Sequence, residues 1–215
     1  MVPTLPCITD MTTNQFQKLV ESLGEPKYRA KQLQHWVYWR LAISFDEMTD
    51  LPQAFRHRLA RETRLHSLIA VREVTGHDGT TKTLFALADG RTVESTLMYY
   101  QSTKGRTRYT ICVSTQVGCP IGCPFCATGQ QGFERNLTPG EIVDQVLYFA
   151  RQLRDQRDEG ENSAGRPVSP ISNIVFMGMG EPLANYDALW QAIEMLNSIE
   201  AFRLGARNMV VSTAG

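Results

Sequence analysis

Three cysteines lie close together in the middle of the chain, in the segment Cys119-Pro-Ile-Gly-Cys123-Pro-Phe-Cys126. A loop with this spacing can wrap three thiolates around one small inorganic group. A structural zinc site is closed by four ligands. A fourth ligand is hard to find here, because the nearest histidine, His77, is far upstream and Cys112 lies on the preceding predicted strand. Three thiolates suit a [4Fe–4S] cluster with one iron open to a small ligand. The spacing therefore favours an iron–sulfur cluster, and a zinc knuckle remains the alternative.

The composition of the whole chain is that of a globular protein. It has 215 residues, 42% of them hydrophobic and 20% charged, with a formal net charge of zero. This charge argues against a strongly basic protein that wraps nucleic acid, but it allows a local basic face. Five cysteines, an odd number, argue against a disulfide framework. No apolar run approaches the ~20 residues of a membrane helix, and the N-terminus has no signal-peptide pattern. We therefore expect a cytoplasmic protein without membrane contact.

The elements that position the cysteines begin with a helical segment. Between residues 13 and 65, apolar residues recur at helical spacing, and Gly24 ends the first helix. Three basic residues open the second helix: Lys27, Arg29 and Lys31. This basic cluster is either a solvated helix face or a surface that faces phosphates. Residues 1–70 are predicted to form a small helical accessory domain.

The pattern then changes from helices to strands. Residues 83–87 and 92–98 are typical of strands, and Asp89-Gly90 between them indicates a hairpin turn. Residues 71–104 are therefore predicted to form a β-hairpin extension. A further strand, roughly residues 108–114, leads directly into the cysteine segment.

From about residue 105 the predicted elements alternate as strand, helix, strand, helix, strand, which indicates a parallel α/β fold. The elements after the strand at 108–114 are a helix opened by the capping box Thr138-Pro-Gly-Glu141, a strand at 171–177, a helix at 187–196 and a strand at 208–211. Residues 155–170 are polar and predict a surface loop. Polar or glycine-rich segments follow the three strands, at 118–132, 178–182 and 212–215. Because parallel strands share one carboxyl edge, these three segments should meet in one site.

The residues around the cysteines resemble those of a known family. The stretches at 112–119, 126–136 and 178–183 (CVSTQVGC, CATGQQGFERN and GMGEPL) are similar to the dual-specificity RNA methyltransferases of the RlmN/Cfr type, in the radical S-adenosylmethionine (radical SAM) superfamily. Residues 29–59 resemble the N-terminal helical domain of that family. The resemblance implies an α/β fold in which residues 105–215 form the N-terminal half of a partial (βα)6 radical-SAM barrel. The helical domain, which would bind RNA, and the β-hairpin extension precede it.

The resemblance implies two cofactors, a [4Fe–4S] cluster on the three clustered cysteines and S-adenosyl-L-methionine on its open iron. Gly180 and Glu181 match the glycine–glutamate contact of the family to S-adenosyl-L-methionine. Glycine lets the backbone approach a ligand closely, and a carboxylate can accept from the methionyl ammonium. Taken without the resemblance, the same residues are a turn after a buried strand. Ser212 matches a serine that also contacts this cofactor.

Two further residues take chemical roles by the resemblance. Glu94 matches the proposed proton acceptor, which removes a proton from the adenine ring after a methyl-bearing cysteine has added to a ring carbon. Cys112 matches a cysteine that forms a transient disulfide with this methyl-carrying cysteine and so releases the product. Without the resemblance, Glu94 would be an outward-facing strand residue and Cys112 a small buried hydrophobic residue.

The implied reaction is methyl transfer to carbon 2 of adenosine in RNA, with carbon 8 as the alternative target. The implied partners are 23S rRNA and tRNA as substrates and flavodoxin or ferredoxin as electron donor. The protein is expected to be a monomer.

The expected barrel is incomplete. Residues 105–215 supply about three strand–helix units, and the methyl-carrying cysteine of the family belongs beyond residue 215. We therefore expect the chain to be the N-terminal part of a longer enzyme. One alternative is an inactive truncated fragment that acts only as an iron–sulfur or zinc RNA-binding module. Another is a glycyl-radical activase, which shares the cysteine triplet but leaves Glu94, Cys112 and the helical domain unexplained.

Overall fold

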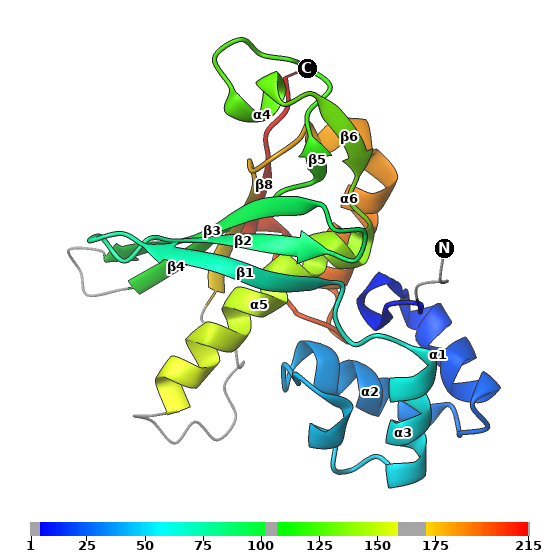
Figure 1. The fold of residues 1–215 in the computed structure, drawn as a ribbon. Coiled ribbons are helices and arrows are strands. Elements are labelled where there is room, and N and C mark those ends of the chain that lie inside the picture. Colours follow the sequence, from blue (N-terminus) through cyan, green and yellow to red (C-terminus); the bar gives the residue numbers. More distant parts are fainter. Residues whose placement is uncertain (1–4, 102–106, 159–170, 215) are drawn as a thin grey trace.

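The computed structural model describes residues 5–101, 107–158 and 171–214, and it shows a helical part beside an α/β part (Figure 1). The helices of the first part are α1 (Thr13–Ser22), α2 (Tyr28–Tyr38) and α3 (Gln53–Glu62), with the short 3-10 helices η1 (Ile8–Asp10) and η2 (Phe45–Glu47). The helices predicted between residues 13 and 65 are therefore confirmed. Their apolar faces pack against one another and bury the side chains of Phe16, Leu33 and Phe55 completely.

Local sequence explains where the first helix begins and ends. The Thr12 hydroxyl accepts a hydrogen bond from the Gln15 amide, and the Gln15 side chain accepts one from the Thr12 amide. This capping box satisfies two amide groups that the first turn leaves without helical partners. Gly24 follows the helix with φ +73°, a left-handed conformation that ends a helix at low cost for glycine.

One six-stranded sheet forms the centre of the α/β part, with the strand order β1-β2-β3-β4-β7-β8. The strands are β1 (Leu68–Thr75), β2 (Thr81–Leu87), β3 (Thr92–Gln101), β4 (Thr107–Cys112), β7 (Ile171–Phe176) and β8 (Met209–Val211). Strands β1 to β4 pair antiparallel, and β4, β7 and β8 pair parallel. The two strands of the predicted hairpin are confirmed as β2 and β3. The sheet is thus mixed, and the antiparallel extension continues directly into the parallel strands.

Strand β1 was not predicted. It is an edge strand, and most of its residues are exposed on both faces, including Ile69, Val71 and Val74. A strand of this kind lacks the alternation of buried and exposed residues by which strands are recognised in a sequence. The extension therefore has three strands rather than two.

The strand predicted at residues 108–114 is shorter than expected. After Cys112 the chain leaves the strand, and the amide of Thr115 donates to the carbonyl of Met179 in the loop after β7, at 2.8 Å. The chain then forms a separate two-stranded sheet of β5 (Gln116–Gly118) and β6 (Phe133–Asn136). The cysteine loop and the short helix α4 (Ala127–Gln130) connect these two strands.

Helix α5 (Pro139–Asp158) covers one face of the sheet (Figure 1). It begins with the predicted capping box, in which the Glu141 amide donates to the Thr138 hydroxyl at 3.2 Å. Its Tyr148 ring packs edge-on against Phe85 of β2, with the ring centroids 5.0 Å apart. The loop predicted from residue 155 is wrong for residues 155–158, which are helical, because Gln and Arg favour helices and the first turn-forming glycine comes later. Residues 159–170 of that predicted loop lie outside the described residues.

The last elements agree with the prediction to within a few residues. Strand β7 is followed by the 3-10 helix η3 (Pro182–Asn185) and helix α6 (Tyr186–Asn197), and the 3-10 helix η4 (Ala206–Asn208) precedes β8. Helix α6 packs against α5. In the part of the chain that the structure describes, no helix is long and apolar enough to cross a membrane.

A buried carboxylate joins the helical part to α5. The side chain of Asp144 is fully buried and accepts hydrogen bonds from the Thr9 hydroxyl at 3.0 Å and from the Ser67 amide and hydroxyl at 2.5 and 2.6 Å. Burial alone would raise the pKa of Asp144, but the hydrogen bond and charge of His66 and the charge of Arg151 lower it below its usual value. Asp144 is therefore ionised at neutral pH, and its hydrogen bonds hold the two parts together.

Candidate functional site

The loops at the carboxyl ends of β4 and β7 are bound to each other. The carbonyl of Met179 accepts from the amides of Thr115 and Gln116, and the side chain of Gln116 accepts from the Glu181 amide at 2.7 Å. The amide of Ala214, beyond β8, donates to the Glu181 carboxylate at 2.9 Å. Segments that are about 100 residues apart in sequence thus meet at one edge of the sheet, as parallel strands require.

Gly180 is required at this junction for a reason that the sequence did not show. Its φ is +105°, and a Cβ at this position would lie 2.6 Å from the Cβ and 2.8 Å from the backbone nitrogen of Gln116. No L-residue fits there without movement of the loop. The sequence analysis expected Gly180 to let the backbone approach a ligand, whereas in the structure Gly180 closely approaches Gln116 of the chain itself.

The carboxylate of Glu181 is held in place by hydrogen bonds. Its side chain accepts from the amide of Leu183 at 3.0 Å as well as from that of Ala214. Burial raises the pKa of Glu181, but the hydrogen bonds from the Ala214 amide, the Thr213 hydroxyl and the Leu183 amide outweigh this effect and lower it. Because a carboxylate has about four acceptor positions, this ionised group keeps capacity for a cationic ligand. Ser212, which directly follows β8, is exposed beside this segment.

The cysteine loop is built on glycine turns and lies at the surface. Gly118 and Gly122 have φ of +74° and +65°, and the amide of Cys119 donates to the carbonyl of Gly132, which closes the loop. All three thiols are free and partly exposed: Cys119, Cys123 and Cys126.

Among the described residues, no group of three or more His, Cys, Asp or Glu side chains lies close enough to hold a metal ion. The three thiols are thus on one loop, but they are not gathered around one point. The hydrogen bond from the Gly129 amide lowers the pKa of Cys126, which favours the thiolate form that a metal binds. Phe125, between two of the cysteines, is 88% exposed. Three sulfur donors on one accessible loop are the chemistry that an iron–sulfur cluster takes.

The strand register places Glu94 and Cys112 on the same face of the sheet. Thr96 of β3 lies opposite Cys112 of β4, and Glu94 is two residues before Thr96. Because side chains alternate along a strand, Glu94 and Cys112 are diagonal neighbours on one face, at a spacing of about 7–8 Å between Cα atoms. Burial raises the pKa of the Cys112 thiol, so this thiol is protonated at neutral pH.

Backbone contacts tie Glu94 to the loop after β7. The Glu94 amide donates to the sulfur of Met179 at 3.3 Å, and the Glu94 carbonyl accepts from the hydroxyl of Ser114. The same hydroxyl accepts from the Met179 amide at 2.8 Å. The structure therefore brings the predicted proton acceptor to the loop that carries Gly180 and Glu181.

The sequence analysis missed Lys82. Its ammonium lies 3.0 Å from the carboxylate of Glu94, and both side chains are about half exposed. Lys82 lies on β2 and pairs with Thr96, so it belongs to the same face as Glu94. The alternation of residues along β2 was the one signal that could have identified it.

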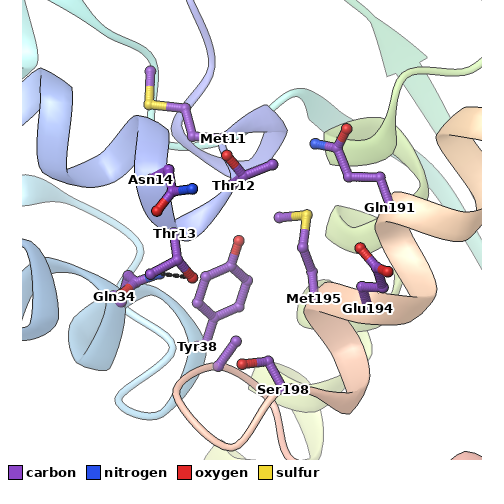
Figure 2. Close-up of a pocket in the computed structure, with 11 residues that line it drawn as sticks. Met11, Thr12, Thr13, Asn14, Gln34, Tyr38, Gln191, Glu194, Met195 and Ser198 are labelled. Atoms are coloured by element: carbon purple, nitrogen blue, oxygen red, sulfur yellow. Dashed lines mark hydrogen bonds between the residues drawn. The ribbon is translucent and has the colours of Figure 1, made fainter.

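A separate cavity of about 270 Å³ lies between the helical part and α6 (Figure 2). The hydroxyl of the buried Tyr38 points into the space between Thr12 and Met195 and has no hydrogen-bond partner among the described residues. Further lining residues include Gln34 of α2 and Gln191 and Glu194 of α6. None of the predicted site residues lines this cavity, so it is not part of the candidate site.

The arrangement of the sheet, the cysteine loop and the helical part matches a solved structure. A radical SAM methyltransferase from Sphaerobacter thermophilus superimposes with a TM-score of 0.86 and 43% sequence identity, over 98% of this chain and 57% of that chain. The described fold is therefore that of part of a radical SAM methyltransferase.

Sequence comparisons define the family more closely. Residues 8–65 match the family described as "Ribosomal RNA large subunit methyltransferase N-terminal domain". The chain is 48% identical over 210 residues to the "Probable dual-specificity RNA methyltransferase RlmN" of Chloroflexus aurantiacus, covering 97% of this chain and 53% of that protein. It is 45% identical over 210 residues to the "Dual-specificity RNA methyltransferase RlmN" of Anaeromyxobacter dehalogenans, covering 98% and 54%. The chain belongs to the RlmN family, and it spans about half the length of the curated relatives it matches.

Proposed function

We propose that this chain provides the cofactor-binding half of a radical SAM methyltransferase that acts on adenosine in RNA. Its α/β part is the N-terminal half of a partial (βα)6 barrel. The observation that carries this proposal is the meeting of Glu94, Cys112 and the loop of Gly180 and Glu181 at one edge of the sheet. Their contacts give each residue a position that suits the role implied by the family.

In this proposal the thiols of Cys119, Cys123 and Cys126 hold a [4Fe–4S] cluster, which supplies the electron that cleaves S-adenosyl-L-methionine. The ionised carboxylate of Glu181 accepts from the ammonium of the methionyl group, and Ser212 contacts the same molecule. The exposed position of the three cysteines leaves room for both groups.

Glu94 acts as the proton acceptor for the adenine ring. The ammonium of Lys82 lies 3.0 Å from its carboxylate, and the half-exposed position of the Glu94 side chain gives access to a large substrate. Cys112 forms the transient disulfide that releases the product. Its partner is the methyl-carrying cysteine, which the family resemblance places beyond residue 215.

The substrates that we propose are 23S rRNA and tRNA, methylated at carbon 2 of adenosine, with carbon 8 as the alternative. The helical part contributes RNA binding, flavodoxin or ferredoxin supplies the electron, and the enzyme is a cytoplasmic monomer. These properties belong to the whole enzyme. Since the matched relatives are about twice as long as this chain, we propose that the 215 residues alone bind the cofactors and do not complete methyl transfer. Methyl incorporation into adenosine by the purified 215-residue chain would contradict this.

Anaerobic reconstitution with iron and sulfide tests the cluster. We expect about four irons per chain, and we expect Cys123→Ala to lose the iron and the visible charge-transfer absorbance, because two thiolates do not hold a cubane firmly. Cys112→Ala is the matched control, since Cys112 lies on β4 outside the loop and its loss should leave the iron content unchanged. Reductive cleavage of S-adenosyl-L-methionine by the reconstituted chain separates this function from that of a zinc-binding RNA module. Full iron retention in Cys123→Ala would refute the assignment.

A further inference from the structure

The antiparallel strands β1 to β4 have one covered face and one open face. Phe85 and Glu73 mark the covered face, because the Phe85 ring packs against Tyr148 of α5 and the Glu73 carboxylate accepts from the Tyr148 hydroxyl at 3.1 Å. Residues one step away in register point to the opposite side. We call this side the open face and define it by Arg72, Lys82, Glu94, Tyr100, Arg108 and Cys112.

The strand register fixes where these residues lie on the open face. Arg72 pairs with Leu84, which pairs with Glu94, so these three form one row across the strands. Lys82 and Cys112 both pair with Thr96 and form the next row.

Tyr100 and Arg108 pair with each other and lie four residues further along the strands. At about 3.4 Å per residue, this pair is about 14 Å from Cys112. The open face thus extends from the candidate site for at least that distance.

The charges on this face are mostly positive, although the net charge of the chain is zero. Arg72, Lys82 and Arg108 are all exposed there, and the acidic residue among them is Glu94. Within the described part of the chain, the guanidinium groups of Arg72 and Arg108 form no hydrogen bond and no ion pair. Other exposed arginines are engaged: Arg91, for example, bonds Glu134 at 2.6 Å. Among the residues that the structure describes, these two guanidinium groups share a face with Glu94 and Cys112 and are available to an anionic partner.

We propose that the open face of β1 to β4 binds the sugar–phosphate backbone of RNA next to the target adenosine. Arg72 and Arg108 contact phosphates, which supply most of the affinity in nucleic-acid recognition without reading sequence. Tyr100, which is 55% exposed, stacks on an unpaired base. The inference rests on the proposed function, because that function makes RNA the substrate and places Glu94 and Cys112 on the same face.

Equilibrium binding of a fluorescently labelled RNA hairpin with unpaired adenosines in its loop tests the proposal. The variants are Arg72→Gln, Arg108→Gln, the double variant and Tyr100→Ala. The control is Arg207→Gln, which removes an exposed arginine from η4, at the amino end of β8 and away from the open face. Affinity is measured over a range of salt concentrations, and thermal unfolding is followed for every variant.

Each lost phosphate contact should reduce the salt slope of log K by about 0.7 and, at about 0.1 M salt, weaken binding about fivefold. The double variant should therefore bind about 25-fold more weakly. Tyr100→Ala should weaken binding fivefold or more without a change of slope, because stacking releases no counterions. Arg207→Gln should match the unmodified chain, and all exposed substitutions should leave the unfolding temperature unchanged.

Equal affinity and slope for the double variant and Arg207→Gln would overturn the proposed surface while leaving RNA binding by the chain intact. Failure of the unmodified chain to bind the hairpin would count against RNA as substrate, and so against the proposed function as well. Binding to vesicles of anionic lipid through the same arginines, without RNA binding, would also overturn the proposal. Cluster assembly is measured separately and does not enter this test.

Discussion

Replacement of Gly118 by alanine should disrupt the loop that carries the three cysteines. Gly118 has φ +74°, and a Cβ there would lie 1.9 Å from the carbonyl oxygen of Gly132 on the other side of the loop. Ordinary contact begins at 3.4 Å, so the two backbone segments must separate by about 1.5 Å, far more than a close-packed structure absorbs without rearrangement. Gly122→Ala is the matched control, because Gly122 has a similar φ of +65° and a Cβ added there would have nothing within 4 Å.

The two substitutions share one cost and differ in another. A left-handed conformation costs an alanine about 1–2 kcal/mol, and this applies to both glycines. At Gly118, the separation also breaks the hydrogen bond from the Cys119 amide to the Gly132 carbonyl, which contributes about 1 kcal/mol, and it disturbs the packing around it. We therefore expect Gly118→Ala to lower the free energy of unfolding by at least about 3 kcal/mol and Gly122→Ala by about 1–2 kcal/mol.

Urea denaturation followed by circular dichroism measures both values, and comparison of the m values shows whether the transition is the same. Hydrogen exchange locates the effect. In Gly118→Ala we expect the β5 and β6 amides to exchange faster and the amides of α1 to α3 to exchange at an unchanged rate. If the two variants differ by less than about 0.5 kcal/mol, which is the scatter of ordinary surface substitutions, the steric argument is wrong.

Three further outcomes follow from the charges and thiols. Asp144→Asn should lower the free energy of unfolding by about 3 kcal/mol at pH 7, because it removes one partner of a buried charged network. Since the pKa of Asp144 is lowered, its contribution to stability is complete above about pH 4 and is lost as pH falls below that value. Urea titrations from pH 3 to 7 should show that the variant lacks this acid dependence. Burial raises the pKa of Asp89, but hydrogen bonds from Arg135 and Arg91 lower it to about 2, so the stabilisation by Asp89 should be complete above about pH 4 and be lost progressively as pH falls toward 2, and Arg135→Gln should shift the carboxyl titration upward in NMR. Burial and the charge of Asp144 raise the pKa of Cys7 to about 11, so mass spectrometry should find Cys7 unmodified by iodoacetamide at pH 8 in the folded chain and modified in urea; rapid alkylation of the folded chain would contradict its burial.

Local sequence was sufficient for most of the elements. The capping box at Thr138 predicted the start of α5, and Gly24 predicted the end of the first helix. These signals act within a few residues, so they do not depend on the rest of the chain. Strand β1 could not be found in this way, since its exposed residues show no alternation. The ends of β4 and α5 were also misjudged, because distant contacts and helix propensity decided them.

The candidate site was predicted in part. The spacing of Cys119, Cys123 and Cys126 in the sequence is enough to indicate three sulfur ligands on one loop. The parallel order of the later strands is enough to predict that the loops after them meet, which the contacts of Glu181 confirm. Lys82 was missed because its importance comes from pairing across strands, not from a motif.

By itself, the sequence determined which residue types this protein has available for chemistry and in which order its helices and strands occur, because spacing and capping act locally. Only the tertiary structure decided that Glu94 and Cys112 share a face, since that depends on the register between β3 and β4. It also decided that Gly180 must be glycine because Gln116 packs against it, and that Arg72 and Arg108 share the face of Glu94 and Cys112 without a side-chain partner among the described residues. A shift of one residue in strand register would move these side chains to the opposite face. Long-range pairing, which no local pattern specifies, therefore decides which of the available groups can act together.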